Sequence, residues 1–204
     1  MDKIDQRLKI TFLGTGTSQG IPVIGSDDPV CLSKDPRDKR LRVSVLVQVD
    51  GHNIVIDCGP DFRQQMLRHP INRLDAILFT HEHADHTAGI DDIRPFFFRQ
   101  GDIPIYAHDR VVASLNRRFD YIFADENRYP GAPAVAVHRV EKGKPFPLGE
   151  LWITPVDARH NRLQVFGYRI KDFAYLTDIK TIDPQEVAHL EGLKVLVVNA
   201  LRKE

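Results

Sequence analysis

Short runs of apolar residues recur along the whole chain and are separated by polar turns. Runs of this length, bounded by turn residues, are typical of buried strands. The pattern predicts strands at Leu8 to Leu13, Val43 to Val49, Ile54 to Asp57, Ala76 to Thr80, Ile103 to Ala107, Leu151 to Val156, Phe166 to Ile170 and Val195 to Val198. This number of strands is too large for a helical bundle.

Helical patterns are fewer than strand patterns, and one of them is expected to begin at an N-cap, Asp61. The Asp50-Gly51 pair between two apolar runs predicts a hairpin, so strands and helices do not simply alternate. We therefore expect an α/β (α+β) fold of two sheets flanked by helices. The predicted helices are about Asp61 to Arg68, the segment after Thr87, about Asp109 to Phe119, and about Pro184 to Glu191.

Length and composition describe an ordinary globular protein. The 204 residues suffice for one sizeable core, and we expect a single domain over residues 1–204. The 28 basic and 28 acidic residues cancel, which argues against nucleic acid as a partner, and no apolar run is long enough for a membrane span. Two cysteines, Cys31 and Cys58, suit a reducing compartment. We therefore predict a cytoplasmic protein.

The strand ending at Thr80 leads into three histidines and one aspartate within residues 81–86. Alternate side chains of an extended segment point the same way, so His81 and His83 can approach one ion together. Asp85 and His86 follow at the turn and can serve a second ion. Isolated histidines are usually surface or capping residues, but a cluster this dense favours metal binding. Imidazole and carboxylate without thiolate suit a catalytic site with zinc, manganese or iron.

Two other segments resemble ligand-binding motifs but are better interpreted as a turn and a loop. The segment Gly14 to Gln19 starts like a dinucleotide fingerprint, but Gln19 stands where a third glycine is required. A tight turn is the better interpretation, with Thr17 or Ser18 as candidate substrate contacts. The basic run Lys34 to Arg42 is interpreted as a solvated loop rather than a phosphate site.

The residues His81-Glu82-His83-Ala84-Asp85-His86 match the His-x-His-x-Asp-His signature, and the whole chain resembles the metallo-β-lactamase-like hydrolases. Further similarity lies in Leu13 to Thr17, Ile56 to Arg63 and Tyr175 to Asp178. These segments resemble the branch that contains the cyclic phosphodiesterase associated with carbon-phosphorus lyase and, more distantly, tRNA 3′-processing endonuclease. The resemblance implies a four-layer αββα sandwich that lacks its last C-terminal elements.

The resemblance also implies a ligand set for two divalent ions, Zn or Mn. His160 would join His81 and His83, and Asp178 would bridge the ions. The last ligand histidine of the family lies beyond a strand like Val195 to Asn199, so the second ion would be weakly bound. Asp57 would orient a ligand histidine, with a turn or helix cap as an equal alternative. The catalytic residues implied are Asp85, His86 and Asp178.

Three functions follow from these expectations. The preferred one is a phosphodiesterase that uses water activated by the metal ions on a small cyclic or nucleotide-like phosphodiester. A thioester or lactam hydrolase, or a tRNA-processing nuclease of the same fold, is the first alternative. A non-catalytic metal-binding or partner-binding protein is the second. The missing elements would leave a sheet edge uncovered, which a second copy in a homodimer could cover.

Overall fold

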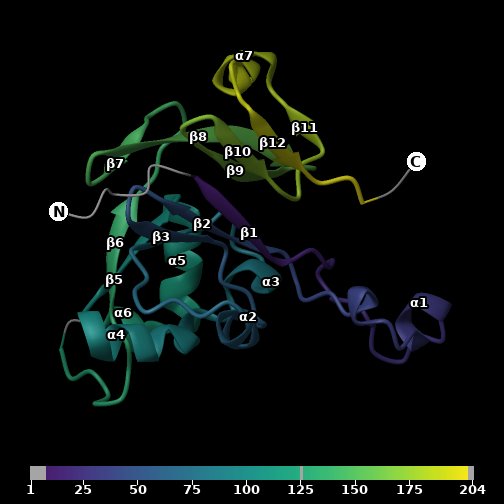
Figure 1. The fold of residues 1–204 in the computed structure, drawn as a ribbon. Helices are drawn as coiled ribbons and strands as arrows, with labels where there is room; N and C mark the ends of the chain where they lie inside the picture. The colour runs from purple at the N-terminus through teal and green to yellow at the C-terminus, as the bar shows by residue number, and fades with distance from the viewer. Residues whose placement is uncertain (1–7, 125, 202–204) are drawn as a thin grey trace. The chain divides into compact units, whose positions relative to one another are not determined.

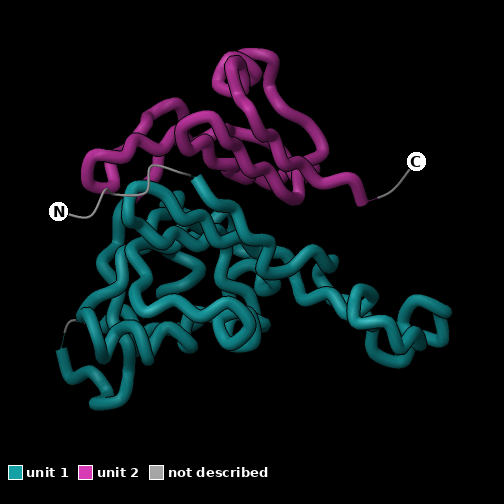
Figure 2. Tube along the Cα trace, in the orientation of Figure 1, with its two compact units in different colours: residues 1–138 teal, residues 139–204 magenta. Residues whose placement is uncertain are grey.

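The computed structural model describes residues 8–124 and 126–201, and its chain divides into two compact units (Figure 2). Unit 1 comprises residues 1–138 and unit 2 comprises residues 139–204. Each unit contains one sheet, and in each sheet antiparallel and parallel pairs occur together. The predicted combination of two sheets with helices is confirmed. The single-domain interpretation stays a prediction.

The sheet of unit 1 has six strands in the order in which they occur along the chain (Figure 1). Antiparallel pairing runs from β1 to β3, and parallel pairing follows from β3 to β5. The predicted hairpin lies at Asp50 and Gly51, both with positive φ, as a turn of this kind requires. The strands are β1 (Lys9–Gly14), β2 (Ser44–Val49), β3 (His52–Ile56), β4 (Ala76–Leu78), β5 (Ile103–Ala107) and β6 (Val135–Arg139).

The helices at residues 62–68, 94–100 and 109–118 pack apolar side chains on one face of this sheet. Phe62, Phe96 and Leu115 share a buried cluster with Val55 and Ile77 of the strands. Burial of such side chains contributes about 1.5–3 kcal/mol each. The helices are α1 (Pro29–Leu32), α2 (Phe62–Arg68), α3 (Ala84–Thr87), α4 (Arg94–Gln100), α5 (Asp109–Arg118) and α6 (Asp120–Phe123), with 3₁₀ turns η1 (Pro36–Asp38) and η2 (Ile90–Ile93).

The sheet of unit 2 has the strand order β11-β8-β9-β10-β12, with β7 paired to β8. Val156 and Leu176 form a small core with Leu190 and Leu193, next to the short helical segment of this unit. The elements are β7 (Phe146–Leu148), β8 (Leu151–His160), β9 (Leu163–Ile170), β10 (Phe173–Leu176), β11 (Thr181–Ile182), α7 (Pro184–Val187), η3 (Ala188–Leu190) and β12 (Val195–Val198).

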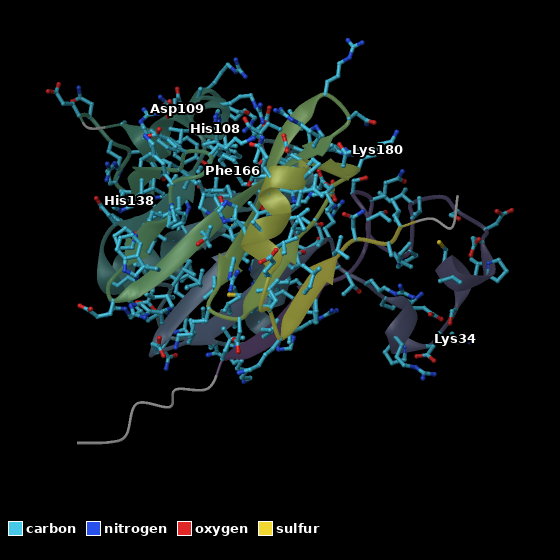
Figure 3. All side chains as sticks on the ribbon, turned by 90° about the horizontal axis from the view of Figure 1, so that it is seen from above. Lys34, His108, Asp109, His138, Phe166 and Lys180 are labelled. Carbon is cyan, nitrogen blue, oxygen red and sulfur yellow. The ribbon has the colours of Figure 1, made fainter. Side chains whose placement is uncertain are left out.

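Two details of unit 1 refine the sequence predictions. Asp61 does precede α2, but its side chain makes no cap hydrogen bond and instead accepts from the backbone N–H and Nη1 of Arg42, at 2.8 and 2.9 Å. The predicted N-cap position of Asp61 is therefore confirmed, but its side chain does not form the capping hydrogen bond. Gly14 is needed in its turn because a Cβ there would overlap the carbonyl oxygen of Arg42. Lys34 lies on the long excursion between β1 and β2 (Figure 3).

Candidate metal centre

The histidine cluster begins where β4 ends. Asp57 follows the neighbouring strand β3, and its N–H donates to the carbonyl oxygen of Leu78 at 3.0 Å. Phe79 continues the ladder by donating to the carbonyl oxygen of Tyr106, at 2.9 Å. The parallel strands thus bring Asp57 and residues 80–86 to the same edge of the sheet. The cluster therefore lies at the carboxyl ends of the parallel strands.

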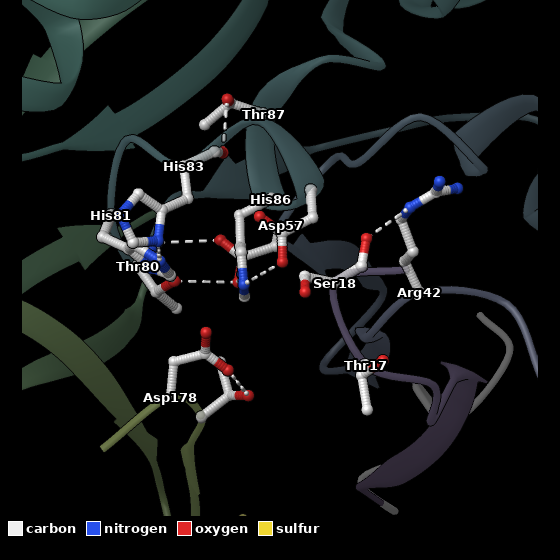
Figure 4. A network of polar contacts seen from close by, with 12 residues as sticks. Thr17, Ser18, Arg42, Asp57, Thr80, His81, His83, His86, Thr87 and Asp178 are labelled. Carbon is white, nitrogen blue, oxygen red and sulfur yellow. Dashed lines mark hydrogen bonds and ion pairs between the residues drawn. The ribbon is translucent and has the colours of Figure 1, made fainter. Parts of the chain in front are cut away.

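A single buried carboxylate, that of Asp57, organises this edge (Figure 4). Its Oδ1 accepts from the N–H of Thr80 at 2.8 Å. Its Oδ2 accepts from the hydroxyl of Thr80 at 2.8 Å and contacts Nδ1 of His86 at 2.6 Å. The Thr80 hydroxyl also lies 3.0 Å from Nδ1 of His81. Asp57 is thus connected to two buried histidines, to one directly and to the other through Thr80.

The hydrogen-bond pattern determines which ring nitrogens are protonated. Because the Thr80 hydroxyl gives its proton to Asp57, its oxygen accepts from Nδ1 of His81. His86 likewise donates from Nδ1 to the carboxylate. This assignment leaves the lone pair of each ring on Nε2. A proton on Nδ1 held by a carboxylate or hydroxyl is the arrangement that commonly orients histidine ligands of metals.

The three imidazoles of unit 1 lie close enough together to bind the same metal ion. Nε2 of His81 is 2.9 Å from Nδ1 of His83, and the rings of His81 and His86 have centroids 4.2 Å apart. Two nitrogens on one tetrahedral zinc would be about 3.3 Å apart, so the spacing fits such an ion. Asp85 adds a carboxylate oxygen 3.3 Å from Nε2 of His86. The donor set of unit 1 therefore fits a metal that prefers nitrogen and oxygen.

Glycines let the chain after β3 approach the histidine segment closely. A Cβ on Gly59 would overlap the carbonyl oxygen of Asp85, and a Cβ on Gly89 would overlap that of Gly59. At this close approach, the N–H of Cys58 donates to the carbonyl oxygen of His86 at 2.8 Å. Burial, and then the carboxylates of Asp92 and Asp57, raise the pKa of the Cys58 thiol well above its usual value. Cys58 therefore stays a neutral packing residue.

Unit 2 brings its own two predicted ligands together. His160 ends β8, and Asp178 follows β10 with a left-handed backbone, φ 55°. Their potential ligand atoms lie within 4.8 Å of each other. The cause is the pairing of β11 with the end of β8, since the N–H of Lys180 donates to the carbonyl oxygen of Arg159 at 2.7 Å. Lys180 is labelled in Figure 3.

Sequence reasoning missed several residues that support the candidate ligands. Thr80 was read only as a strand end, although its position directly before the histidine cluster was a signal. Asn199 had no signal: its side chain accepts from the N–H of Ile179 at 3.0 Å and donates to the carbonyl oxygen of the same residue at 3.3 Å, which fixes the segment after Asp178. Such supports are long-range contacts, and local patterns do not contain them.

The fold and the histidine cluster define the class of protein. The sequence profile described as beta-lactamase superfamily domain matches residues 52–204, so the chain belongs to the metallo-β-lactamase superfamily and has its fold. Within that class, it is similar to a crystal structure of a diphosphatase from the PhnP family. The two share 41% sequence identity with a TM-score of 0.87, over 97% of this chain and 76% of that chain.

Further relatives carry different names. An octanoyltransferase of Porphyromonas gingivalis is 41% identical over 196 residues, which are 96% of this chain and 39% of that protein. This chain therefore spans about two-fifths of that relative's length. A ribonuclease Z of Mycobacterium sp. (strain KMS) is 26% identical, over 97% of this chain and 70% of that protein. Zn²⁺-bound PqqB from Methylobacterium extorquens, 21% identical over 94% of this chain and 72% of that chain with a TM-score of 0.74, shares the fold.

No described helix meets the length and hydropathy that a bilayer crossing requires.

Proposed function

We propose that this protein is a metal-dependent hydrolase that cleaves a P–O bond in a small phosphodiester or diphosphate. The main observation behind the proposal is that Asp57 orients the buried rings of His81 and His86, directly or through Thr80. Two histidines with this orientation are suited to binding a metal ion, whereas packing alone does not require it. The similarity to a PhnP-family diphosphatase over 97% of the chain supports the substrate class.

In this proposal the ligands of both units act together on two divalent ions, Zn or Mn. The resemblance of the sequence to the metallo-β-lactamase-like hydrolases, in which an aspartate at the position of Asp178 bridges the ions, supports a carboxylate shared by both ions. Asp85 would complete the set. When bound, the ions would lower the pKa of a water and neutralise charge on phosphate oxygens.

The chain's own residues have distinct tasks in this reaction. Asp57 and Thr80 hold the protons of His86 and His81 on Nδ1, so that both rings would offer their Nε2 lone pairs to a metal ion. The carboxylates of Asp85 and Asp178 would balance the positive charge of the ions. Asp85 directly precedes His86, and its Oδ2 lies 3.3 Å from Nε2 of His86, so both groups would offer ligand atoms to the same ion. No serine or cysteine nucleophile is needed.

A second candidate is hydrolysis or transfer of an acyl group. It is favoured by the 41% identity to a protein named octanoyltransferase. That likeness covers only 39% of the relative's length, so its name gives weaker support than the diphosphatase does. The same metal ligands could serve either chemistry, which makes the substrate the point to test.

The test is a comparison of substrates with metal-loaded protein. Metal content is measured first, and then hydrolysis of bis(p-nitrophenyl) phosphate, a nucleoside diphosphate, an octanoyl thioester and a chromogenic lactam. We expect turnover of the two phosphorus compounds that disappears with a chelator and returns with zinc or manganese. Turnover of the thioester alone would establish the second candidate. Bound ions without any turnover would establish a non-catalytic metal-binding protein.

Asp178→Asn supplies the matched variant. Asn tolerates the left-handed backbone at this position but is a poor replacement for a shared carboxylate. We expect phosphodiester hydrolysis to fall about a thousandfold, the rate equivalent of several kcal/mol of lost charge stabilisation. Asp172→Asn, which changes an acid of the same unit paired with Lys194, should leave the rate unchanged. Full activity of Asp178→Asn would show that the ligand assignment is wrong.

A further inference from the structure

The helix α5 reaches the histidine segment through an arginine at its end. Nη2 of Arg118 donates to the hydroxyl oxygen of Thr87 at 2.9 Å and to the carbonyl oxygen of Glu82 at 3.3 Å. Nε of the same guanidinium donates to the carbonyl oxygen of Ser114, one turn earlier in α5, at 3.2 Å. The guanidinium therefore has a fixed orientation and links α5 to the histidine segment.

The hydroxyl of Thr87 links Arg118 to the backbone of His83. Its side chain is fully buried, and its hydroxyl donates to the carbonyl oxygen of His83 at 2.7 Å. A hydroxyl has one proton, so the oxygen that donates to His83 must accept from Arg118. The two bonds therefore form one directed chain, from Arg118 through Thr87 to the backbone of His83.

The contacts fix the two peptide groups on either side of the His83 Cα. The carbonyl of Glu82 is held by Arg118 and that of His83 by Thr87. The carboxylate of Glu82 is also paired with Nε of Arg110, at the other end of α5, at 2.8 Å. With both peptide planes held, the direction of the Cα–Cβ bond of His83 is determined, and the ring can differ only by its own two torsions. His83 is the exposed histidine of the cluster, whereas His81 and His86 are buried and are ordered by Asp57.

We propose that Arg118 and Thr87 are positioning residues that set His83 for metal binding. This inference rests on the proposed metal-dependent function. An ordinary helix contact would stabilise α3 and α5 in the same way with or without metal. A positioning pair has a different signature, because it lowers the cost of ordering a ligand and therefore changes the affinity for the ion. Supports of this kind are typically worth about 10-fold to 100-fold in metal affinity.

The experiment measures zinc affinity, by competition with a chromophoric chelator, alongside thermal unfolding of the metal-free protein. Thr87→Val removes the hydroxyl at constant shape, and Arg118→Met removes the charge but keeps an unbranched apolar stem. Each should weaken zinc binding about tenfold and leave the metal-free unfolding temperature close to that of the wild type. The double variant should be no weaker than either single one, since both break the same chain of contacts.

Conservative variants and a neighbour serve as controls. Thr87→Ser keeps the hydroxyl and should restore wild-type affinity. Arg117→Met alters the adjacent exposed arginine of α5 and should change nothing. With cobalt in place of zinc, the visible absorption of Thr87→Val should differ from that of the wild type, because one ligand is less well ordered.

Several results would overturn the inference. They are unchanged zinc affinity in Thr87→Val and Arg118→Met, equal losses in Thr87→Ser and Thr87→Val, or a loss of affinity fully matched by destabilisation of the metal-free protein. No substrate is needed for these measurements. Zinc binding without hydrolysis would therefore refute only the proposed function, whereas a wild-type protein that binds neither zinc nor manganese would refute both.

Discussion

The two units position their candidate ligands by different means. In unit 1 the rings of His81 and His86 are held by the hydrogen bonds that they donate to Thr80 and Asp57, and all four residues are buried. In unit 2 His160 is the last residue of a long strand, and Asp178 stands in a left-handed turn after another strand. The first arrangement depends on side-chain chemistry and the second on strand register.

This difference suggests how the site tolerates change. A buried hydrogen-bonded network loses most of its order when one member is removed, because the remaining polar groups lose their partners. A ligand placed by strand register depends instead on backbone pairing spread over many residues, such as the eight pairs of β8 with β9. Substitutions near the ligands should therefore matter more in unit 1 than in unit 2.

The sharpest test of this comparison is Asp57→Asn. Asn fits the left-handed backbone of this position, φ 64°, so the change alters the chemistry alone. The amide has one acceptor oxygen, so it cannot accept from the Thr80 N–H on one side and from the Thr80 hydroxyl and His86 on the other, as the carboxylate does. We expect metal affinity to fall about 10-fold to 100-fold, with a loss of about 1–3 kcal/mol of unfolding free energy from the unsatisfied buried groups. Chelator competition and denaturant titration measure the two effects.

Asp75→Asn is the control for the loss of a buried carboxylate. Asp75 precedes β4, accepts from the N–H of Asn53 at 2.8 Å, and pairs with Arg73. It lies at the opposite end of the strands from Asp57. This variant should lose stability but keep the metal affinity of the wild type. Equal losses of affinity in both variants would mean that Asp57 acts only on the fold.

A pair of glycines extends the comparison to packing. In Gly59→Ala the new Cβ would overlap the backbone carbonyl of Asp85, which cannot move without shifting the histidine segment. In Gly167→Ala it would approach the Leu176 side chain, 2.6 Å from Cγ, and the carbonyl oxygen of Tyr175, at 2.9 Å. Each should cost about 1–3 kcal/mol of stability, but only Gly59→Ala should also weaken metal binding. Similar metal affinities in the two variants would contradict this distinction.

The smallest expected difference concerns acid stability. Arg94 and the Tyr121 hydroxyl contact Asp91 in unit 1, and the hydrogen bond from Arg94 lowers the pKa of that carboxyl. A depressed folded-state pKa adds stability that is present above the unfolded value of about 3.9 and is lost as the pH falls through the folded value. Asp91→Asn should therefore lower the free energy of unfolding by less than about 1 kcal/mol at neutral pH. It should also make that free energy fall less steeply as the pH is lowered.

Unit 2 offers the matched case. Lys194 lowers the pKa of the Asp172 carboxyl, but Lys194 is largely exposed, whereas Arg94 is half-buried, so solvent screens the Asp172 pair more strongly. Asp172→Asn should leave the acid unfolding curve unchanged. Unfolding followed by circular dichroism between pH 2 and pH 7 compares the variants. A larger change in Asp172→Asn than in Asp91→Asn would reverse the expected ranking.

The sequence predicted those parts of the fold that depend on local pattern. The predicted bounds of β5 and β12 match the structure, because each is an apolar run with clear turn residues around it. The end of β8 was missed because it carries Asp157, Arg159 and His160, residues that no strand propensity favours. Its strand conformation comes from pairing with β9, and the buried Asp157 is satisfied by Gln164 and Lys142 from elsewhere in the chain.

The site divides in the same way. Residues 81–86 could be recognised directly, since their spacing along the chain reflects their arrangement in space. The link from Asp57 to His86 joins residues 29 positions apart, so the sequence alone left two interpretations of Asp57 open, and the structure places its carboxylate on the ring. The contacts of Thr87 with Arg118 had no sequence signature, because a threonine and an arginine 31 positions apart are common in any chain.

The left-handed backbone at both Asp57 and Asp178 has a consequence for protein design. The backbone strongly disfavours most side chains at these two positions, and Gly, Asn and Asp are the residues that fit well. Because the proposed site needs a carboxylate at each position, only Asp meets both requirements. A designer who grafts this site onto another scaffold must therefore copy two turn conformations as well as two carboxyl groups. Scaffolds with Gly or Asn already in such turns are the natural starting points.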